Sequence, residues 1–309
     1  MNHQHTQTPS GKSLLQAIAS NANLSTLYEA NLDGCGLTVF PIGVLRLAGL
    51  SVISLFDNQL TDIPGDIAQL RHLKTLNLAQ NQLSTVPDSV GDLEELEMLD
   101  LGHNRLSMLP GSFGALINLV YLYVSNNQLS SLPSSMSALS RLRYLNITDN
   151  RFHDLPSWLG RLNHLTELRV YGNSLSTLPT EIGTLSNLVE LHASRNQITS
   201  LPESVGELSS LAKFDLQDNR LSELPGSIGN LSRLTELNLR FNHLATLPQE
   251  ITRLSTLEYL DLRANALTSI PEEFHKLSNL RKLDLRWNRL ATYPPCLTSL
   301  VNRGCVVFV

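Results

Sequence analysis

The feature that most constrains this chain is an asparagine that recurs every 23 residues, with no insertion or deletion. Cys35 occupies the same phase one repeat before the first asparagine, and a proline follows each of these twelve positions by six residues. A strict period of this length is typical of a solenoid, in which each repeat stacks on its neighbours. The asparagines are Asn58, Asn81, Asn104, Asn127, Asn150, Asn173, Asn196, Asn219, Asn242, Asn265 and Asn288.

Apolar residues within one repeat predict a short strand followed by a helical turn. Leu76 and Leu78 alternate with polar neighbours, which is the period of a strand with one buried face. Val90 and Leu93 are three residues apart and follow Pro87, as expected where a helical turn begins with proline. One repeat cannot bury these side chains alone, so we expect a core that is continuous through the stack.

The asparagine column has a structural interpretation. The chain must turn after each strand, which would leave buried backbone groups without partners. An asparagine amide both donates and accepts hydrogen bonds, so it can satisfy the turn of its own repeat and of the adjacent one. Cys35 fits the same position as a small buried residue.

The repeated motif resembles the intracellular, 23-residue type of leucine-rich repeat, found in bacterial, plant Ras-group-related and Ras-suppressor-like proteins. The resemblance rests on Leu178-Pro179 through Ile182-Gly183 and Leu185, and it extends over residues 27–302 as twelve copies. It implies an α/β solenoid, a horseshoe with a parallel β-sheet on its concave face and short helices or 3₁₀ turns on its convex face. Members of this family mostly bind other proteins.

The ends of the chain differ from the repeats. Residues 1–11 are polar and are interpreted as a disordered tail. Residues 12–26 carry apolar side chains at helical spacing and predict an N-terminal helical cap, since a terminal repeat would otherwise expose its leucines. Residues 303–309 end on an apolar run and predict a capping strand.

Composition excludes several classes of partner. The net charge of −5 favours no nucleic-acid partner, and no apolar run is long enough to cross a membrane. Cys35, Cys296 and Cys305 are too few for the cysteine-paired caps of extracellular repeats, which favours the cytoplasm, although a bridge between Cys296 and Cys305 is conceivable. We expect a monomer, because both ends of the stack are capped.

No residues are predicted to form a catalytic, cofactor or metal site. Ser10-Gly11-Lys12-Ser13 matches only the end of a phosphate-binding loop, whose other glycine is replaced by Thr6. Kinase signatures are absent as well. His103 and His192 lie four repeats apart, too far to share one metal ion.

The variable outward positions of the strands are the candidates for binding a partner. They lie six, four, two and one residues before each asparagine. Four of the seven tyrosines fall there in neighbouring repeats, and tyrosine is enriched in binding hot spots. The alternative is that they only stack along the sheet. The candidates in this region are Tyr121, Tyr123, Tyr144, Arg169 and Tyr171.

A second candidate region lies in the last repeats. Arg240, Arg263 and Arg286 form a column, beside which runs a second column of Asp215, Asn238, Asp261 and Asp284. The arginines could bind acidic groups of a partner, or the two columns could neutralise each other as an exposed charge ladder. The aromatic residues that flank the arginine column are Phe241, Tyr259 and Trp287.

These features predict a non-enzymatic scaffold that binds a protein partner on its concave face, as in signalling complexes. Two alternatives keep the scaffold and change the biology. The chain could be a bacterial effector secreted into a host cell, or the substrate-recognition subunit of a ligase or kinase complex. The sequence names no partner, and the involvement of a small GTPase would rest on family analogy alone.

Overall fold

A computed structural model describes residues 11–20 and 22–309. The predicted tail, residues 1–11, lies outside the described residues except for Gly11. The chain divides into two compact units, Met1–Leu142 and Arg143–Val309, and both consist of the same strand-and-turn repeat. The predicted solenoid of parallel strands and 3₁₀ turns is confirmed.

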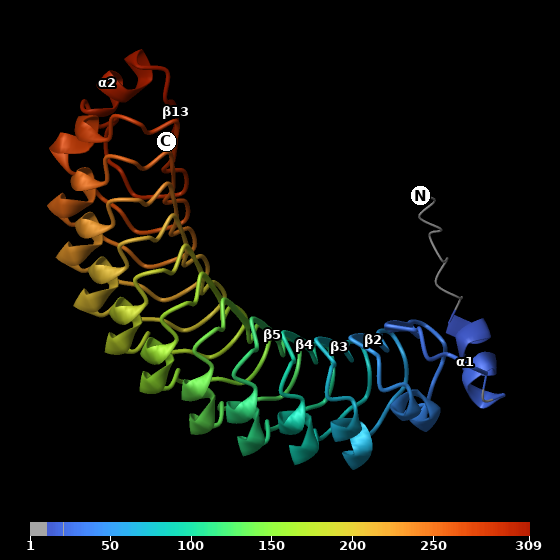
Figure 1. Cartoon of the computed structure of the whole chain (residues 1–309). Coiled ribbons are helices and arrows are strands. Elements are labelled where there is room, and N and C mark those ends of the chain that lie inside the picture. The colour runs from blue at the N-terminus through green and yellow to red at the C-terminus, as the bar shows by residue number, and fades with distance from the viewer. Residues whose placement is uncertain (1–10, 21) are drawn as a thin grey trace, which may run out of the picture. The chain divides into compact units, whose positions relative to one another are not determined.

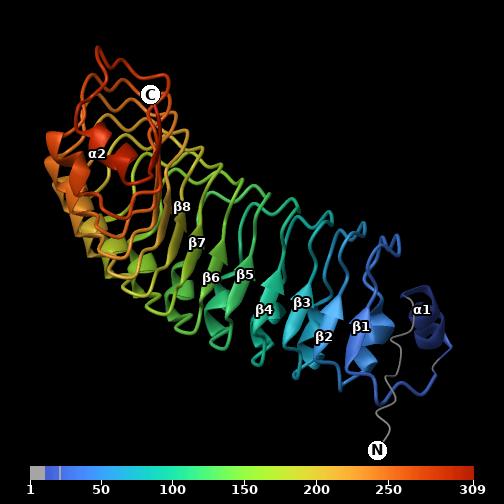
Figure 2. The same ribbon diagram turned by 90° about the horizontal axis from the view of Figure 1, so that it is seen from above.

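The strands of each unit are parallel and pair in the order of the sequence, side by side in two views (Figure 1; Figure 2). Residues one repeat apart face each other, as Thr75 and Met98 do. The strands of the first unit are β1 (Glu29–Asn31), β2 (Val52–Ser54), β3 (Thr75–Asn77), β4 (Met98–Asp100) and β5 (Tyr121–Tyr123). Those of the second are β6 (Tyr144–Asn146), β7 (Glu167–Arg169), β8 (Glu190–His192), β9 (Lys213–Asp215), β10 (Glu236–Asn238), β11 (Tyr259–Asp261), β12 (Lys282–Asp284) and β13 (Val306–Phe308).

A 3₁₀ helix follows the proline of eleven repeats, on the side of each unit opposite the strands (Figure 1). The fixed φ of proline suits this start, and its carbonyl accepts the first helical bond, as from Ile67 N–H to Pro64 at 3.0 Å. The 3₁₀ helices are η1 (Ile42–Arg46), η2 (Gly65–Gln69), η3 (Asp88–Asp92), η4 (Gly111–Ala115) and η5 (Ser134–Ala138) in the first unit. In the second they are η6 (Ser157–Arg161), η7 (Thr180–Thr184), η8 (Glu203–Glu207), η9 (Gly226–Asn230), η10 (Gln249–Arg253) and η11 (Glu272–Lys276).

The core of each unit lies between its strands and its 3₁₀ helices. The middle residue of nearly every strand points into it, and so do the leucines that precede and follow the strand. Four phenylalanines are among the largest fully buried side chains: Phe113, Phe152, Phe214 and Phe274. The stack therefore fixes the leucines by packing and leaves the outward strand positions free to vary.

At least ten of the eleven asparagine amides of the column are bonded to backbone groups of two repeats. In one copy, the side-chain nitrogen of Asn81 donates to the carbonyls of Leu55, Leu78 and Ala79, while its oxygen accepts from the N–H of Leu60 at 2.9 Å. This pattern satisfies the groups that the turn would otherwise leave buried and unpaired. Cys35 departs from the expectation of a buried side chain, because it is half-buried and its thiol donates only to its own turn, at Asp33 O.

Both ends carry extra elements. Helix α1 (Gly11–Ala19) lies beside the first repeat in both views and buries Leu14 next to β1 and η1 (Figure 1; Figure 2). At the other end, helix α2 (Leu297–Asn302) replaces the 3₁₀ helix of the last repeat and leads into β13. Strand β13 pairs with β12 through residues 24 apart, so the period lengthens by one residue there.

Candidate interaction surface

The outward side chains of the strands form what we call the strand face of each unit. In the second unit this face lines the inner side of the curve (Figure 1). The first and third residues of nearly every strand are exposed or half-buried, while the middle one is buried. Two further positions follow in the turn, directly before the asparagine. The first of them is buried in some repeats, as at Thr148 and Ser194, and half-buried in others.

The position four residues before the asparagine has a backbone role that the sequence analysis did not recognise. At this position the side-chain oxygen of Asn or Asp accepts the N–H two residues later, as Asp100 does from Gly102 at 2.8 Å. The same bond joins Asp215 to Gln217 at 3.1 Å. Such Asx turns fix the chain as it leaves the strand. The recurrence of Asn and Asp in this column was the sequence signal for these turns. It was interpreted instead as one side of an exposed charge ladder.

The position directly before the asparagine has a left-handed backbone in both units. Its φ is positive at ten non-glycine residues, including Phe241 at 57° and Trp287 at 62°. Glycine, asparagine and aspartate adopt this conformation with little strain, whereas a bulky residue there costs roughly 1 kcal/mol or more. Two strained aromatics with exposed fractions of 46% and 66% are not explained by folding, which favours a binding role.

The predicted tyrosines belong to two different units. In the first, Tyr121 is 43% exposed and Tyr123 is half-buried on the same strand. In the second, Tyr144 and Tyr171 are both half-buried. Arg169 lies 5.8 Å from the centre of the Tyr144 ring, so part of that ring is covered by a cation. Arg169 also donates to Glu167, and this bond helps to raise its pKa although burial lowers it.

Two of the three arginines in the column are paired within their own repeat. Nε of Arg263 donates to Oδ1 of Asp261 at 2.9 Å, and Nε of Arg286 donates to Oδ1 of Asp284 at the same distance. Burial raises the pKa of Asp284, but the hydrogen bonds from Arg286 outweigh burial and hold that pKa below its usual value. The charge ladder therefore exists at these two repeats. Arg240 differs, because the residue beside it is Asn238.

One of the aromatic residues of this region, Tyr259, lines a groove on the strand face. The groove has a volume of about 280 Å³ and crosses β8 to β12, with Lys213 and Tyr259 among its lining residues. Phe308, which the sequence analysis placed only in a capping strand, lies 4.8 Å from the guanidinium carbon of Arg286. The last repeats of the second unit thus combine exposed aromatic rings, arginines and a groove, which are typical of binding hot spots.

A polar cluster lies on β7 and β8. Glu167, Glu190 and His192 have donor atoms within 4.8 Å of one another, so these described residues could hold a metal ion. Both carboxylates are already engaged, Glu167 by Arg169 and Glu190 by Lys213 at 3.0 Å. Burial raises the pKa of Glu190, but the hydrogen bonds from Lys213 and His192 outweigh burial and hold that pKa below its usual value. The cluster is neutralised by its own cations, and the expectation of no metal site stays a prediction.

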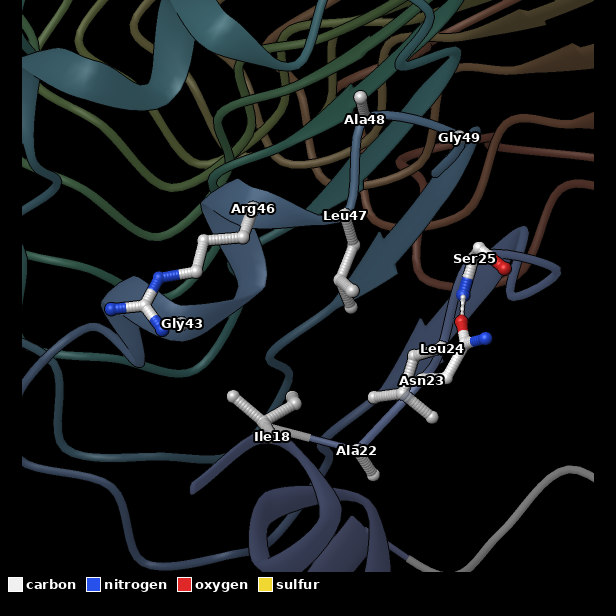
Figure 3. A pocket seen from close by; sticks show the side chains of 10 residues that line it. All are labelled: Ile18, Ala22, Asn23, Leu24, Ser25, Gly43, Arg46, Leu47, Ala48 and Gly49. Carbon is white, nitrogen blue, oxygen red and sulfur yellow. Dashed lines mark hydrogen bonds between the residues drawn. The ribbon is translucent and has the colours of Figure 1, made fainter. Parts of the chain in front are cut away.

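A cleft of about 450 Å³ lies beside α1 and the first repeat (Figure 3). Ile18, Leu24 and Leu47 form its apolar walls, and Arg46 is the one ionisable side chain among the described residues that line it. A single arginine offers no nucleophile or acid–base pair. The cleft is therefore not a candidate active site.

The remaining motifs show no catalytic arrangement among the described residues. Gly11, Lys12 and Ser13 lie in helix α1 rather than in a loop after a strand, while Ser10 lies outside the described residues. Cys296 and Cys305 are both free thiols, so the conceivable bridge is not formed. Burial raises the pKa of each thiol, which disfavours the reactive thiolate. None of the described helices has the length and apolar character needed to span a lipid bilayer.

Comparison with known proteins agrees with this architecture. A family model described as a leucine-rich repeat region matches residues 42–142 and 191–302, and another, described as a leucine rich repeat, matches residues 141–162. No curated protein sequence matches the chain.

Several solved structures are similar. A leucine-rich repeat protein of Leptospira interrogans is 37% identical, with a TM-score of 0.88, over 92% of this chain and 73% of its own. The Arabidopsis receptor kinase HAESA, in complex with the peptide hormone IDA and the co-receptor SERK1, is 30% identical over 90% of this chain, with a TM-score of 0.72. This chain covers 53% of HAESA. An internalin of Listeria monocytogenes is 24% identical over 97% of this chain and 93% of its own, with a TM-score of 0.72, which shows the fold alone.

Proposed function

This chain belongs to the leucine-rich repeat proteins, and from that premise we propose that it is a non-enzymatic module that binds a protein partner on its strand face. The observation that carries the proposal is the pair of exposed aromatic residues, Phe241 and Trp287, in left-handed backbone on the second unit. Folding does not require large side chains at these positions. Binding does benefit from them, since an aromatic ring buries a large area with few rotatable bonds.

The cysteines indicate the compartment in which the protein acts. Three free cysteines suit a reducing compartment, so we place the protein in the cytoplasm as a monomeric scaffold. HAESA, a structural neighbour, was solved with a peptide hormone and a protein co-receptor. A surface of this architecture can therefore hold protein ligands, and the groove on β8 to β12 is where we place the partner of this chain.

We expect that replacing both Phe241 and Trp287 with alanine weakens partner binding by at least about thirtyfold, because even one hot-spot aromatic contributes about 2 kcal/mol or more. The experiment is affinity capture from native extract, read by mass spectrometry and followed by titration of the captured protein. The matched control is Tyr293→Ala, which removes an aromatic side chain of 51% exposure that is not on a strand. Equal recovery by the double variant and the control would contradict the proposal.

The tyrosines provide a separate test for each unit. Tyr121→Ala with Tyr123→Ala probes the first unit, and Tyr144→Ala with Tyr171→Ala probes the second. If the tyrosines contact the partner, each pair should reduce the titrated affinity severalfold while the circular dichroism spectrum is unchanged. If they only stack along the sheet, affinity is unchanged and the melting temperature falls instead.

A further inference from the structure

The arginine column of the second unit contains one cation without a carboxylate partner. Arg263 and Arg286 each bond the aspartate two residues earlier, Asp261 and Asp284. Arg240 has Asn238 at the corresponding position, and among the described residues no carboxylate lies within ion-pair distance of it. The nearest equivalent acid on the next strand, Asp261, is occupied by Arg263.

The Nε atom of Arg240 is buried and has no hydrogen-bond partner among the described residues. Asn238 does not supply one in this structure, where its oxygen accepts the backbone N–H of Arg240 at 3.3 Å and its nitrogen donates to Oε1 of Gln217 at 3.4 Å. A buried donor without an acceptor is costly, and more so when it is charged. Arg240 thus lacks the internal acceptor that Arg263 and Arg286 have. Because its Nε atom is buried, an acceptor brought by a ligand would meet the outer nitrogens of this half-buried side chain.

The surroundings of Arg240 indicate which acceptor fits. Its guanidinium carbon lies 5.8 Å from the centre of the Phe241 ring, and a planar guanidinium held against a ring can still donate in its own plane. A carboxylate matches that fork with two parallel bonds. A doubly charged phosphate is less well suited, because Asp215 and Asp261 flank Asn238 on the neighbouring strands.

We propose that Arg240 is the seat for a carboxylate from an acidic segment of the protein partner, with an apolar side chain of that segment packed on Phe241. This inference rests on the proposed function and specifies its partner as an acidic, partly apolar segment. Asn238 is the residue that keeps the seat open. An aspartate there would pair with Arg240, as Asp261 pairs with Arg263.

The test closes the seat without removing any arginine. Asn238→Asp supplies the missing intramolecular carboxylate, and the Asx turn is retained because Asp261 makes the same backbone bond at 3.1 Å. The probe is a display library of random short peptides, selected on the wild-type protein alone so that the variant remains an independent test. We expect the recovered peptides to share an aspartate or glutamate next to an apolar residue.

Titration of a recovered peptide then measures the pairing. Asn238→Asp should lower the affinity for the peptide roughly ten- to hundredfold, and amidation of the acidic residue of the peptide should do the same. The two changes combined should lower the affinity little more than either change alone. Asn163→Asp controls for the added charge, because Asn163 is exposed and is not part of a strand. Asp261→Asn removes a carboxylate from the same column and should leave the affinity equal or higher.

Three results would overturn this inference. They are peptides that bind Asn238→Asp as well as wild type, peptides without a shared acid, and stronger competition by inorganic phosphate than by acetate at equal concentration. None of these contradicts protein recognition as such, since that is judged from Phe241 and Trp287. Loss of the captured partner in the aromatic variant, together with indifference to Asn238→Asp, would leave the proposed function standing and remove the carboxylate seat.

Discussion

Replacing Asn219 with alanine is expected to lower the free energy of unfolding by roughly 2–5 kcal/mol, because it removes four hydrogen bonds from a buried turn. The side-chain nitrogen of Asn219 donates to Ala193 O and Leu216 O at 3.0 Å and to Gln217 O at 3.3 Å. Its oxygen accepts the N–H of Ile198 at 3.0 Å. Alanine leaves the N–H of Ile198 without this acceptor, at about 1–3 kcal/mol where water does not reach it. The three carbonyls each lose one of two hydrogen bonds, because Asn196, Asn242 and the N–H of Arg195 still donate to them.

Urea unfolding followed by circular dichroism gives the free energy directly. The control is Asn163→Ala, an exposed asparagine outside the column, which should change stability by less than about 0.5 kcal/mol. Hydrogen exchange should also show faster opening of the repeats around Asn219, because repeats in a solenoid contact only their neighbours. If both alanine variants unfold at the same urea concentration, water replaces the amide and the structural role assigned to the column is wrong.

The scaffold could be predicted from the sequence because each of its parts has a period. The leucines must alternate to bury one face of a strand, and the asparagine must recur where the chain turns inward. Parallel pairing of residues one repeat apart, such as Glu236 and Tyr259, then follows from stacking identical units. The choice between α-helix and 3₁₀ helix after each proline did not follow, because only two apolar positions mark that segment.

The candidate site could be predicted only as a set of outward positions. The sequence identified Asp261 and Arg263 as neighbours, but the neutralisation of one by the other depends on side-chain geometry. Arg240 appeared equivalent to Arg263, although its neighbour Asn238 already showed the missing acid. The strain at Trp287 was not recognised either, although Gly34, Asn126 and Gly172 in the same column were a signal of left-handed backbone. Arg240 and Trp287 differ from the other residues because each has an energetic cost that folding alone does not require: a buried donor without an acceptor at Arg240, and a strained backbone at Trp287.

Replacing Gly229 with alanine should destabilise the second unit by about 3 kcal/mol, at the upper end of the cost of overpacking. Helix η9 lies close to η10 at this point, and a Cβ on Gly229 would lie 2.3 Å from the carbonyl oxygen of Glu250. That atom belongs to the backbone, so the two repeats would have to move apart. The same close approach recurs in the repeats of Gly91, Gly114, Gly160, Gly183 and Gly206. Thr252 occupies this position one repeat after Gly229 and is buried, so not every repeat requires glycine there.

Gly226→Ala is the matched control for Gly229→Ala, because it adds the same methyl group to the same 3₁₀ helix. The nearest atom to its Cβ would be 3.7 Å away, which is ordinary van der Waals contact. We expect this variant to be neutral or up to about 1 kcal/mol more stable, since alanine restricts the unfolded chain. Thermal and urea unfolding of the two variants should therefore diverge in opposite directions from wild type. Equal stability would mean that neighbouring repeats shift apart at little cost, and that the stack is more compliant than its core packing indicates.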